Sequence, residues 1–105
     1  MDKVHQDDLK KFCPNASKAH IDAIVKHLGV AMQSRDAQMV ACSSNSELER
    51  VRESWLKRKL KLTQTDAELD AAIKKVCATM KDTNQKSRVA FYYLLAEHYN
   101  KLDAI

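Results

Sequence analysis

The chain has 105 residues, a formal net charge of +4, and 45% apolar against 30% charged residues. This length leaves room for one domain, residues 1–105, and the apolar content excludes an intrinsically disordered chain. One glycine and one proline are too few for the turns of a hairpin protein, whereas helix-forming residues dominate. The composition therefore predicts an all-α fold.

Two further features of the sequence indicate where in the cell the protein is located. The sequence lacks a run of about 18 apolar residues, and its opening stretch, MDKVHQDDLKKF, is charged where a signal peptide would be apolar. We therefore expect a cytoplasmic protein without a membrane partner. The cysteines are odd in number and widely spaced: Cys13, Cys42 and Cys77. This pattern predicts three reduced, mostly buried thiols rather than a disulfide framework or a zinc site.

The first part of the chain predicts two helices. Residues 2–12 form the first, which ends before Pro14 because proline disfavours a helical residue ahead of it. The second runs from a cap at Ser17 to a stop at Gly29, with apolar residues recurring at intervals of three and four. Within residues 30–41 we expect one or two short turns of helix.

The second part predicts three more helices. Ser46 and Glu49 form a capping box that opens the basic stretch SELERVRESWLKRKLKL, and Thr65 and Glu68 repeat the device before the next helix. The last helix, about residues 85–101, begins after a DTN cap region and is apolar over most of its circumference. We therefore expect a single compact bundle of about five short helices, with this last helix at its centre.

The basic stretch is the main candidate for a binding surface. On a wheel with 3.6 residues per turn, one side gathers the apolar residues Leu48, Val51, Trp55 and Leu62, so Trp55 is expected to point into the core. A second cluster on the far side suggests a polyanion-binding strip, to which two more arginines could contribute; the candidate residues are Arg50, Lys57, Lys61, Arg35 and Arg88. The alternative is an ordinary solvated helix face with flanking cations, which the nearby Glu53 favours.

We expect the aromatic and histidine residues to have structural roles. The stretch FYYLL is expected to pack in the core, with the hydroxyl of Tyr93 remaining in water. His20 and His27 are seven residues apart and lack the spacing of a helical zinc motif, and His98 is expected at the boundary of the core. No arrangement of a nucleophile with a base and no cofactor fingerprint is found, so we expect no metal, no cofactor and no catalytic residues.

Several stretches together resemble a known family: IVKH, SRDAQMVACS, ELERVRESWLKRKLKL, ELDAAIKKVCATMK and SRVAFYYLLAEHYNKLDA. The chain is similar, over nearly its whole length, to a family of small bacterial proteins described only as a domain of unknown function. The resemblance implies a free-standing helical bacterial protein and assigns no catalytic or binding residues.

Two functional hypotheses follow. The first is a non-enzymatic cytoplasmic protein that acts by binding another protein, because a small bundle without a recognisable catalytic arrangement is more simply explained by surface contact. The alternative is nucleic-acid or polyanion binding through the basic helix, residues 47–61, by contacts to phosphates. A homodimer is also left open, because the last helix is very apolar and could leave a patch that a second copy covers.

Overall fold

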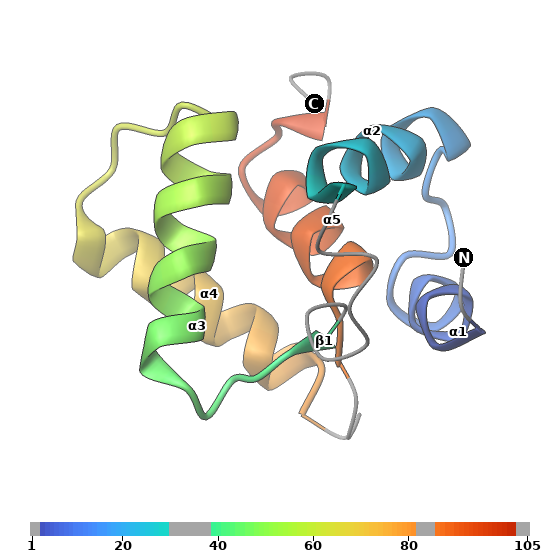
Figure 1. Cartoon of the computed structure of the whole chain (residues 1–105), viewed down its shortest axis with the longest axis horizontal. Coiled ribbons are helices and arrows are strands. Elements are labelled where there is room, and N and C mark those ends of the chain that lie inside the picture. The colour runs from blue at the N-terminus through green and yellow to red at the C-terminus, as the bar shows by residue number, and fades with distance from the viewer. Residues whose placement is uncertain (1–2, 30–38, 82–85, 103–105) are drawn as a thin grey trace.

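A computed structural model of the chain describes residues 3–29, 39–81 and 86–102, and these form a helical bundle (Figure 1). The elements in chain order are α1 (Lys3–Phe12), α2 (Lys18–Leu28), β1 (Met39–Val40), α3 (Asn45–Arg50), η2 (Val51–Lys59), α4 (Asp66–Thr79), β2 (Lys86–Ser87) and α5 (Arg88–His98). The all-α prediction is therefore confirmed. Within these residues, no helix is both long enough and apolar enough to span a membrane.

The first two helices match their predictions. α1 ends at Phe12, two residues before Pro14. In α2 the Ser17 hydroxyl accepts a hydrogen bond from the amide of Ala19, and Gly29 follows the helix with a φ of 45°. That positive φ is unfavourable for residues that carry a Cβ atom, which explains why the chain's single glycine is found there.

The basic helix starts earlier than predicted. Its cap is Ser44, whose Oγ accepts from the amide of Glu47, so the capping box expected at Ser46 and Glu49 is wrong. Ser46 already lies in the first turn, with its Oγ 3.1 Å from that of Ser44. α3 then continues directly into η2, and Figure 1 shows them as one rod.

η2 is a π-helix, in which the amide of residue i+5 bonds to the carbonyl of residue i; the amide of Leu60, for example, bonds to the carbonyl of Trp55 at 2.9 Å. The wider turn brings residues four and five apart onto one face. The buried residues of this segment are accordingly Val51, Trp55 and Leu56, and Leu60, which follows the helix, is buried as well. The prediction for Trp55 is confirmed, whereas Leu48 and Leu62, which the 3.6-residue wheel also placed on this side, are only partly buried.

α5 is the central helix, as predicted. It contacts α1 and α2 on one side and η2 and α4 on the other (Figure 1). It is shorter than expected at both ends: it begins after Ser87, whose hydroxyl caps it by accepting from the amide of Ala90, and it ends at His98. The predicted DTN cap falls on residues 82–84, outside the described residues. Thr65 caps α4 as predicted.

The prediction that the Tyr93 hydroxyl remains in water is wrong. Its side chain is 3% exposed rather than wet at the hydroxyl, and burial raises its pKa, with Glu97 and Cys13 acting in the same direction. The physical reason is that α2 packs against the side of α5 that would otherwise face water.

Two short strands replace part of a predicted helix. β1 and β2 pair antiparallel, with Met39 opposite Ser87 and Val40 opposite Lys86. A helix was expected within residues 30–41; residues 30–38 lie outside the described part, and the strand overturns the expectation for residues 39 and 40. Long-range contacts support the extended backbone, because the Ser87 amide donates to Asp8 Oδ2 at 2.8 Å.

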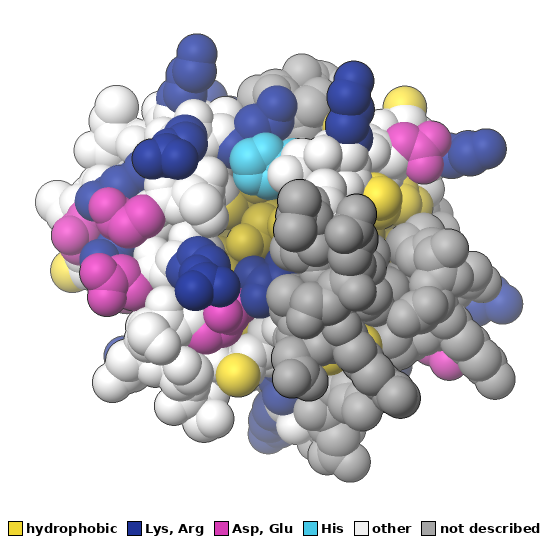
Figure 2. All heavy atoms as spheres, in the orientation of Figure 1, with side chains coloured by type: hydrophobic (Ala, Val, Ile, Leu, Met, Phe, Trp, Pro, Cys, Tyr) yellow, Lys and Arg dark blue, Asp and Glu magenta, His cyan; other side chains and the backbone are white. Residues whose placement is uncertain are grey.

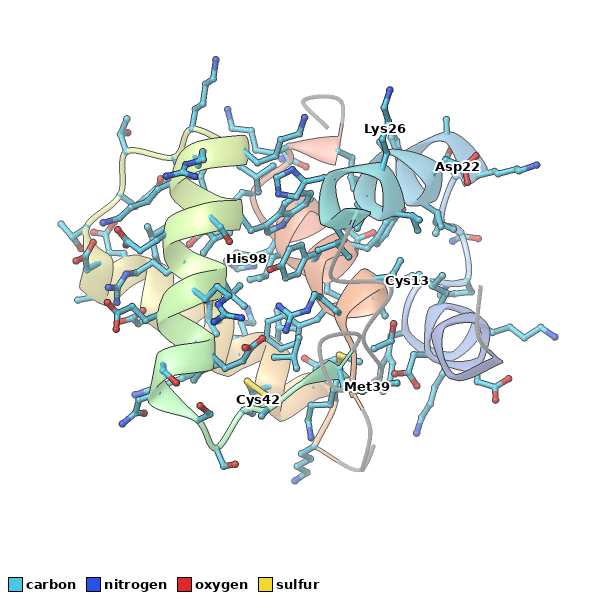
Figure 3. All side chains as sticks on the ribbon, in the orientation of Figure 1. Cys13, Asp22, Lys26, Met39, Cys42 and His98 are labelled. Atoms are coloured by element: carbon cyan, nitrogen blue, oxygen red, sulfur yellow. A yellow bond between two sulfur atoms is a disulfide. The ribbon has the colours of Figure 1, made fainter. Side chains whose placement is uncertain are left out.

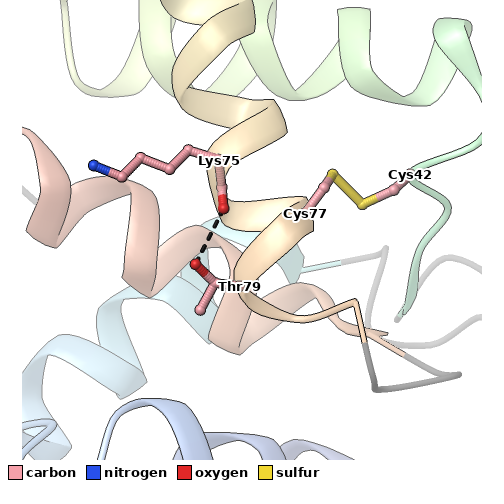
Figure 4. The surroundings of a disulfide bond; sticks show 4 residues. All are labelled: Cys42, Lys75, Cys77 and Thr79. Atoms are coloured by element: carbon pink, nitrogen blue, oxygen red, sulfur yellow. Dashed lines mark hydrogen bonds between the residues drawn. A yellow bond between two sulfur atoms is a disulfide. The ribbon is translucent and has the colours of Figure 1, made fainter.

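The prediction for the cysteines is wrong for two of the three. Cys42 and Cys77 form a disulfide that joins the loop before α3 to α4, with their Cα atoms 6.0 Å apart (Figure 4). Their separation of 35 residues explains why spacing did not reveal the pair, since only packing brings the two segments together. Cys13 is free and buried, as expected.

Candidate anion-binding site

The structure describes four of the five cations that the sequence suggested for a binding strip, and it places them in different surroundings. Arg50 and Lys61 are exposed, Lys57 is half-buried, and Arg88 is buried. Arg35 lies outside the described residues. The described members therefore do not form one continuous cationic surface.

Lys57 belongs to a network of charged residues between η2 and the start of α4. Its Nζ lies 2.9 Å from Glu53 Oε2 and 2.5 Å from Asp66 Oδ1. Arg52 completes the network through Glu53 at 2.9 Å and Asp70 at 3.0 Å. Hydrogen bonds to these carboxylates raise the pKa of Lys57, and the hydrogen bond from Lys57 lowers the pKa of Asp66. The network combines two cations with three carboxylates, so Lys57 is not a free cation of the predicted strip.

Arg88 is enclosed in the bundle and is 4% exposed. Its guanidinium forms an ion pair with Glu47 and donates to the hydroxyl of Tyr92 at 3.1 Å and to the carbonyl of Met39 at 3.3 Å. These contacts join α3, β1 and α5. Arg88 therefore has a structural role and presents no surface to a ligand.

A cationic hollow lies elsewhere, between α2 and the C-terminal end of η2. It has a volume of about 490 Å³ and is lined by Ala23, Lys26, His27 and Lys59. Figure 2 shows a histidine between lysine and arginine side chains on this face, above a patch of hydrophobic surface. Within the described residues, no ion pair within 4.0 Å involves Lys26 or Lys59. We call the residues Lys26, His27 and Lys59 the cationic hollow.

The two helices hold these side chains by different means. His27 packs against the indole of Trp55, with ring centroids 5.0 Å apart. Burial lowers the pKa of His27, and the nearby Lys59 lowers it further, so both causes favour the neutral imidazole. In Figure 3 the side chain of Lys26 extends from α2 away from the bundle, with Asp22 one turn earlier on the same helix. The hollow thus carries two ammonium groups and one imidazole that titrates below its ordinary range.

Two smaller hollows have other chemistry. One of about 160 Å³ is lined by residues that include Lys75, Thr79, Glu97 and His98. The Thr79 hydroxyl donates to the Lys75 carbonyl at 3.1 Å (Figure 4), so it is not oriented towards His98 as a nucleophile would be. The other, of about 240 Å³, lies between the α3–η2 rod and α4, and the paired side chains of Arg52 and Asp70 form part of its wall. Across residues 3–29, 39–81 and 86–102, no three His, Cys, Asp or Glu side chains are placed to hold a metal ion.

Comparison with known protein families gives one match. A family model described as a protein of unknown function, DUF2853, covers residues 4–103. The chain belongs to the DUF2853 family. The resemblance noted in the sequence is thereby confirmed. A comparison of this DUF2853 chain with curated proteins finds no match.

The sequence did not single out the cationic hollow. In the sequence, His27 stands out only as a neighbour of His20, and Lys59 is one of six basic residues of the basic helix. One local signal was present, because the sequence VKH just before Gly29 places two basic residues at the end of α2. Its proximity to Lys59 depends on how α2 packs against η2, which periodicity does not specify.

Proposed function

We propose that this DUF2853 chain is a non-enzymatic interaction protein of the bacterial cytoplasm that binds an acidic segment of a partner protein at the cationic hollow. The observation that carries the proposal is the placement of Lys26, His27 and Lys59, from two helices, around one concavity, with no carboxylate among the described residues that line it. The chain's net charge of +4 favours the approach of an acidic partner.

The size of the hollow also favours a protein segment. Its volume of about 490 Å³ lies within the range of roughly 300–1,000 Å³ that is typical of small-ligand sites, so it can accept one or two side chains of a segment. A nucleic-acid strand would instead be expected to need a continuous track of cations along its phosphates. The basic helix, residues 47–61, supports such a track less well, because Lys57 is paired with Glu53 and Asp66.

The proposal is tested with a fluorescein-labelled, glutamate-rich peptide, whose binding is followed by fluorescence anisotropy at low and at physiological salt. We expect the double variant Lys26→Glu, Lys59→Glu to bind about tenfold more weakly, which corresponds to roughly 1.4 kcal/mol. The matched control is Lys10→Glu, Lys81→Glu, which changes the net charge equally at two exposed lysines outside the hollow. The control should bind like the unmodified chain.

Three results would overturn the proposal. The first is an absence of peptide binding even at low salt, where electrostatic contacts are least screened. The second is an equal loss of binding in both double variants, since net charge alone would then account for the binding. The third is tighter binding of single-stranded DNA or RNA of equal length and charge, which would favour the basic helix as the site.

A further inference from the structure

We infer that the cationic hollow is built for a phosphoryl group, so that the acidic segment is anchored by a phosphomonoester, and that His27 takes up a proton when this group binds. The inference rests on the proposed function and names the chemistry of its partner. Its first support is the match of charge. The hollow offers two ammonium groups at neutral pH, and a phosphomonoester carries a charge of about −1.5 to −2 at pH 7, whereas a carboxylate carries only one.

The second support is the kind of donor that lines the hollow. Each lysine presents three N–H donors on a flexible stem, and a protonated imidazole presents two more. Lysine binds phosphate as a point charge, without the fixed geometry of the arginine fork, which matches phosphate and carboxylate alike. The two arginines of η2 do not line this hollow, and one of them, Arg52, is engaged by Asp70 and Glu53.

The third support is the surroundings of His27. Among the described residues, Lys59 on η2 and Lys26 on its own helix are the charged groups that line the hollow beside it, and Trp55 is a neutral contact. On α5, which packs against α2, the carboxylate of Glu97 raises the pKa values of Cys13 and Tyr93. The described residues thus give His27 cationic neighbours, and an arriving dianion would reverse the sign of the local field and favour the imidazolium.

A specific dependence on pH follows from this geometry. Affinity should rise as the pH falls from about 8 towards 6.5, because binding is then coupled to proton uptake by His27. Below about pH 6 the phosphoryl group itself becomes a monoanion, and affinity should fall again. A carboxylate ligand would lack this fall until much lower pH, since its pKa is about 4.

The test compares three peptides of one sequence that carry phosphoserine, glutamate or serine at the same position. Trp55 is the chain's single tryptophan and contacts His27, so its fluorescence reports binding and protonation of the imidazole. We expect the phosphoserine peptide to bind at least about tenfold more tightly than the glutamate peptide, a difference of roughly 1.4 kcal/mol. Calorimetry in two buffers with different ionisation enthalpies should show proton uptake near pH 7.

Two variants separate the roles of the residues. His27→Gln retains a polar side chain but not the titration, so it should still bind the phosphoserine peptide while losing the proton uptake. Lys26→Gln with Lys59→Gln should abolish the preference for phosphoserine over glutamate, whereas Lys10→Gln with Lys81→Gln should leave it unchanged. Circular dichroism spectra of all variants check that they are folded.

The outcomes distinguish this inference from the proposed function. If the glutamate peptide binds at the hollow and phosphoserine binds no more tightly, the phosphoryl inference is wrong and the proposed function stands. If His27→Gln retains the same proton uptake, the role of His27 is wrong. If inorganic phosphate binds as tightly as the phosphoserine peptide, the hollow is a site for free phosphate and the anchoring of a segment is overturned.

Discussion

Trp55 shows at the scale of one residue how the basic helix is held against the bundle. Its side chain is fully buried, and its indole stacks on Tyr92 with ring centroids 4.7 Å apart. The Nε1–H donates to the backbone carbonyl of Tyr92 at 3.1 Å, so the only polar atom of the side chain is satisfied inside the core. Trp55 therefore links η2 directly to the central helix, α5.

Substitutions of Trp55 should separate packing from hydrogen bonding. Trp55→Ala removes both and should lower the free energy of unfolding by about 3–5 kcal/mol. Trp55→Phe keeps an aromatic ring but loses the N–H donor, and should cost less, about 1–2 kcal/mol. Urea denaturation followed by circular dichroism measures both values. Equal effects of the two variants would contradict the role assigned to packing.

Glu47 and Glu49 form a matched pair on one short helix. Glu47 is half-buried and paired with the buried Arg88, whereas Glu49 is exposed without an ion pair among the described residues. Glu47→Ala should cost about 3 kcal/mol, because it removes the partner of a buried charge, whereas Glu49→Ala should change stability by less than about 0.5 kcal/mol. Urea denaturation of both variants tests the difference, and similar values would show that the pair contributes little.

At the scale of the elements, the α3–η2 rod shows where sequence periodicity failed. An ordinary helical wheel correctly placed Val51 and Trp55 inside but missed Leu56 and Leu60, because it assumed 3.6 residues per turn. The helix caps were easier to predict, because Ser17 and Thr65 accept hydrogen bonds from amides only two or three residues away in the chain. Ser44, two residues before the predicted cap, shows that adjacent serines are not distinguished by the local pattern.

The disulfide joins the loop before α3 to α4, and its effect on stability can be measured. Reduction should lower the free energy of unfolding by about 2–4 kcal/mol, because the closed loop of 35 residues no longer restricts the unfolded chain. The double variant Cys42→Ser, Cys77→Ser should show the lower stability with or without reductant. In a reducing cytoplasm the pair is expected as two thiols.

Alkylation provides an independent check of the same bond. The unfolded, non-reduced chain should take up one alkyl group, at Cys13, because the other two of its three cysteines are joined. After reduction it should take up three. Three alkyl groups without reduction would show that the disulfide does not form.

At the scale of the whole molecule, the core binds protons more tightly than the unfolded chain does. Burial, assisted by Glu97 and Asp8, raises the pKa of Cys13 from its ordinary value of 9.0 to about 12. Burial also raises the pKa of Tyr93 and of Tyr99. Each group is therefore neutral in the folded protein at a pH where it would ionise in the unfolded chain.

This difference predicts loss of stability in alkali. The unfolded thiol loses its proton near pH 9, whereas the folded thiol retains it to about pH 12. The contribution of Cys13 is fully present below pH 9 and falls as the pH rises from 9 to 12, by up to about 1.4 kcal/mol per pH unit. Urea midpoints measured between pH 8 and about 10.5 test this, and Cys13→Ala should reduce the slope. An unchanged slope would show that Cys13 is not the group responsible.

The charged surface of the whole molecule was the least predictable feature. The sequence located six basic residues between Arg50 and Lys61 but not their partners, and Asp66 and Asp70 on α4 engage two of them. The cationic hollow combines two helices that are separated by more than 20 residues in the chain. A helical wheel describes one helix at a time, and so it showed neither the ion pairs of Arg52 and Lys57 with α4 nor the hollow.

The sequence by itself determined the helical class, the ends of the first two helices, the start of α4, the inward position of Trp55 and the central position of α5. These features depend on composition and on interactions within a few residues, so the sequence alone is enough to predict them. Only the tertiary structure decided the disulfide, the paired strands, the burial of Arg88 and the grouping of Lys26 with Lys59. Each of these joins residues 30 to 50 apart in the chain, whose meeting depends on how complete helices pack against one another.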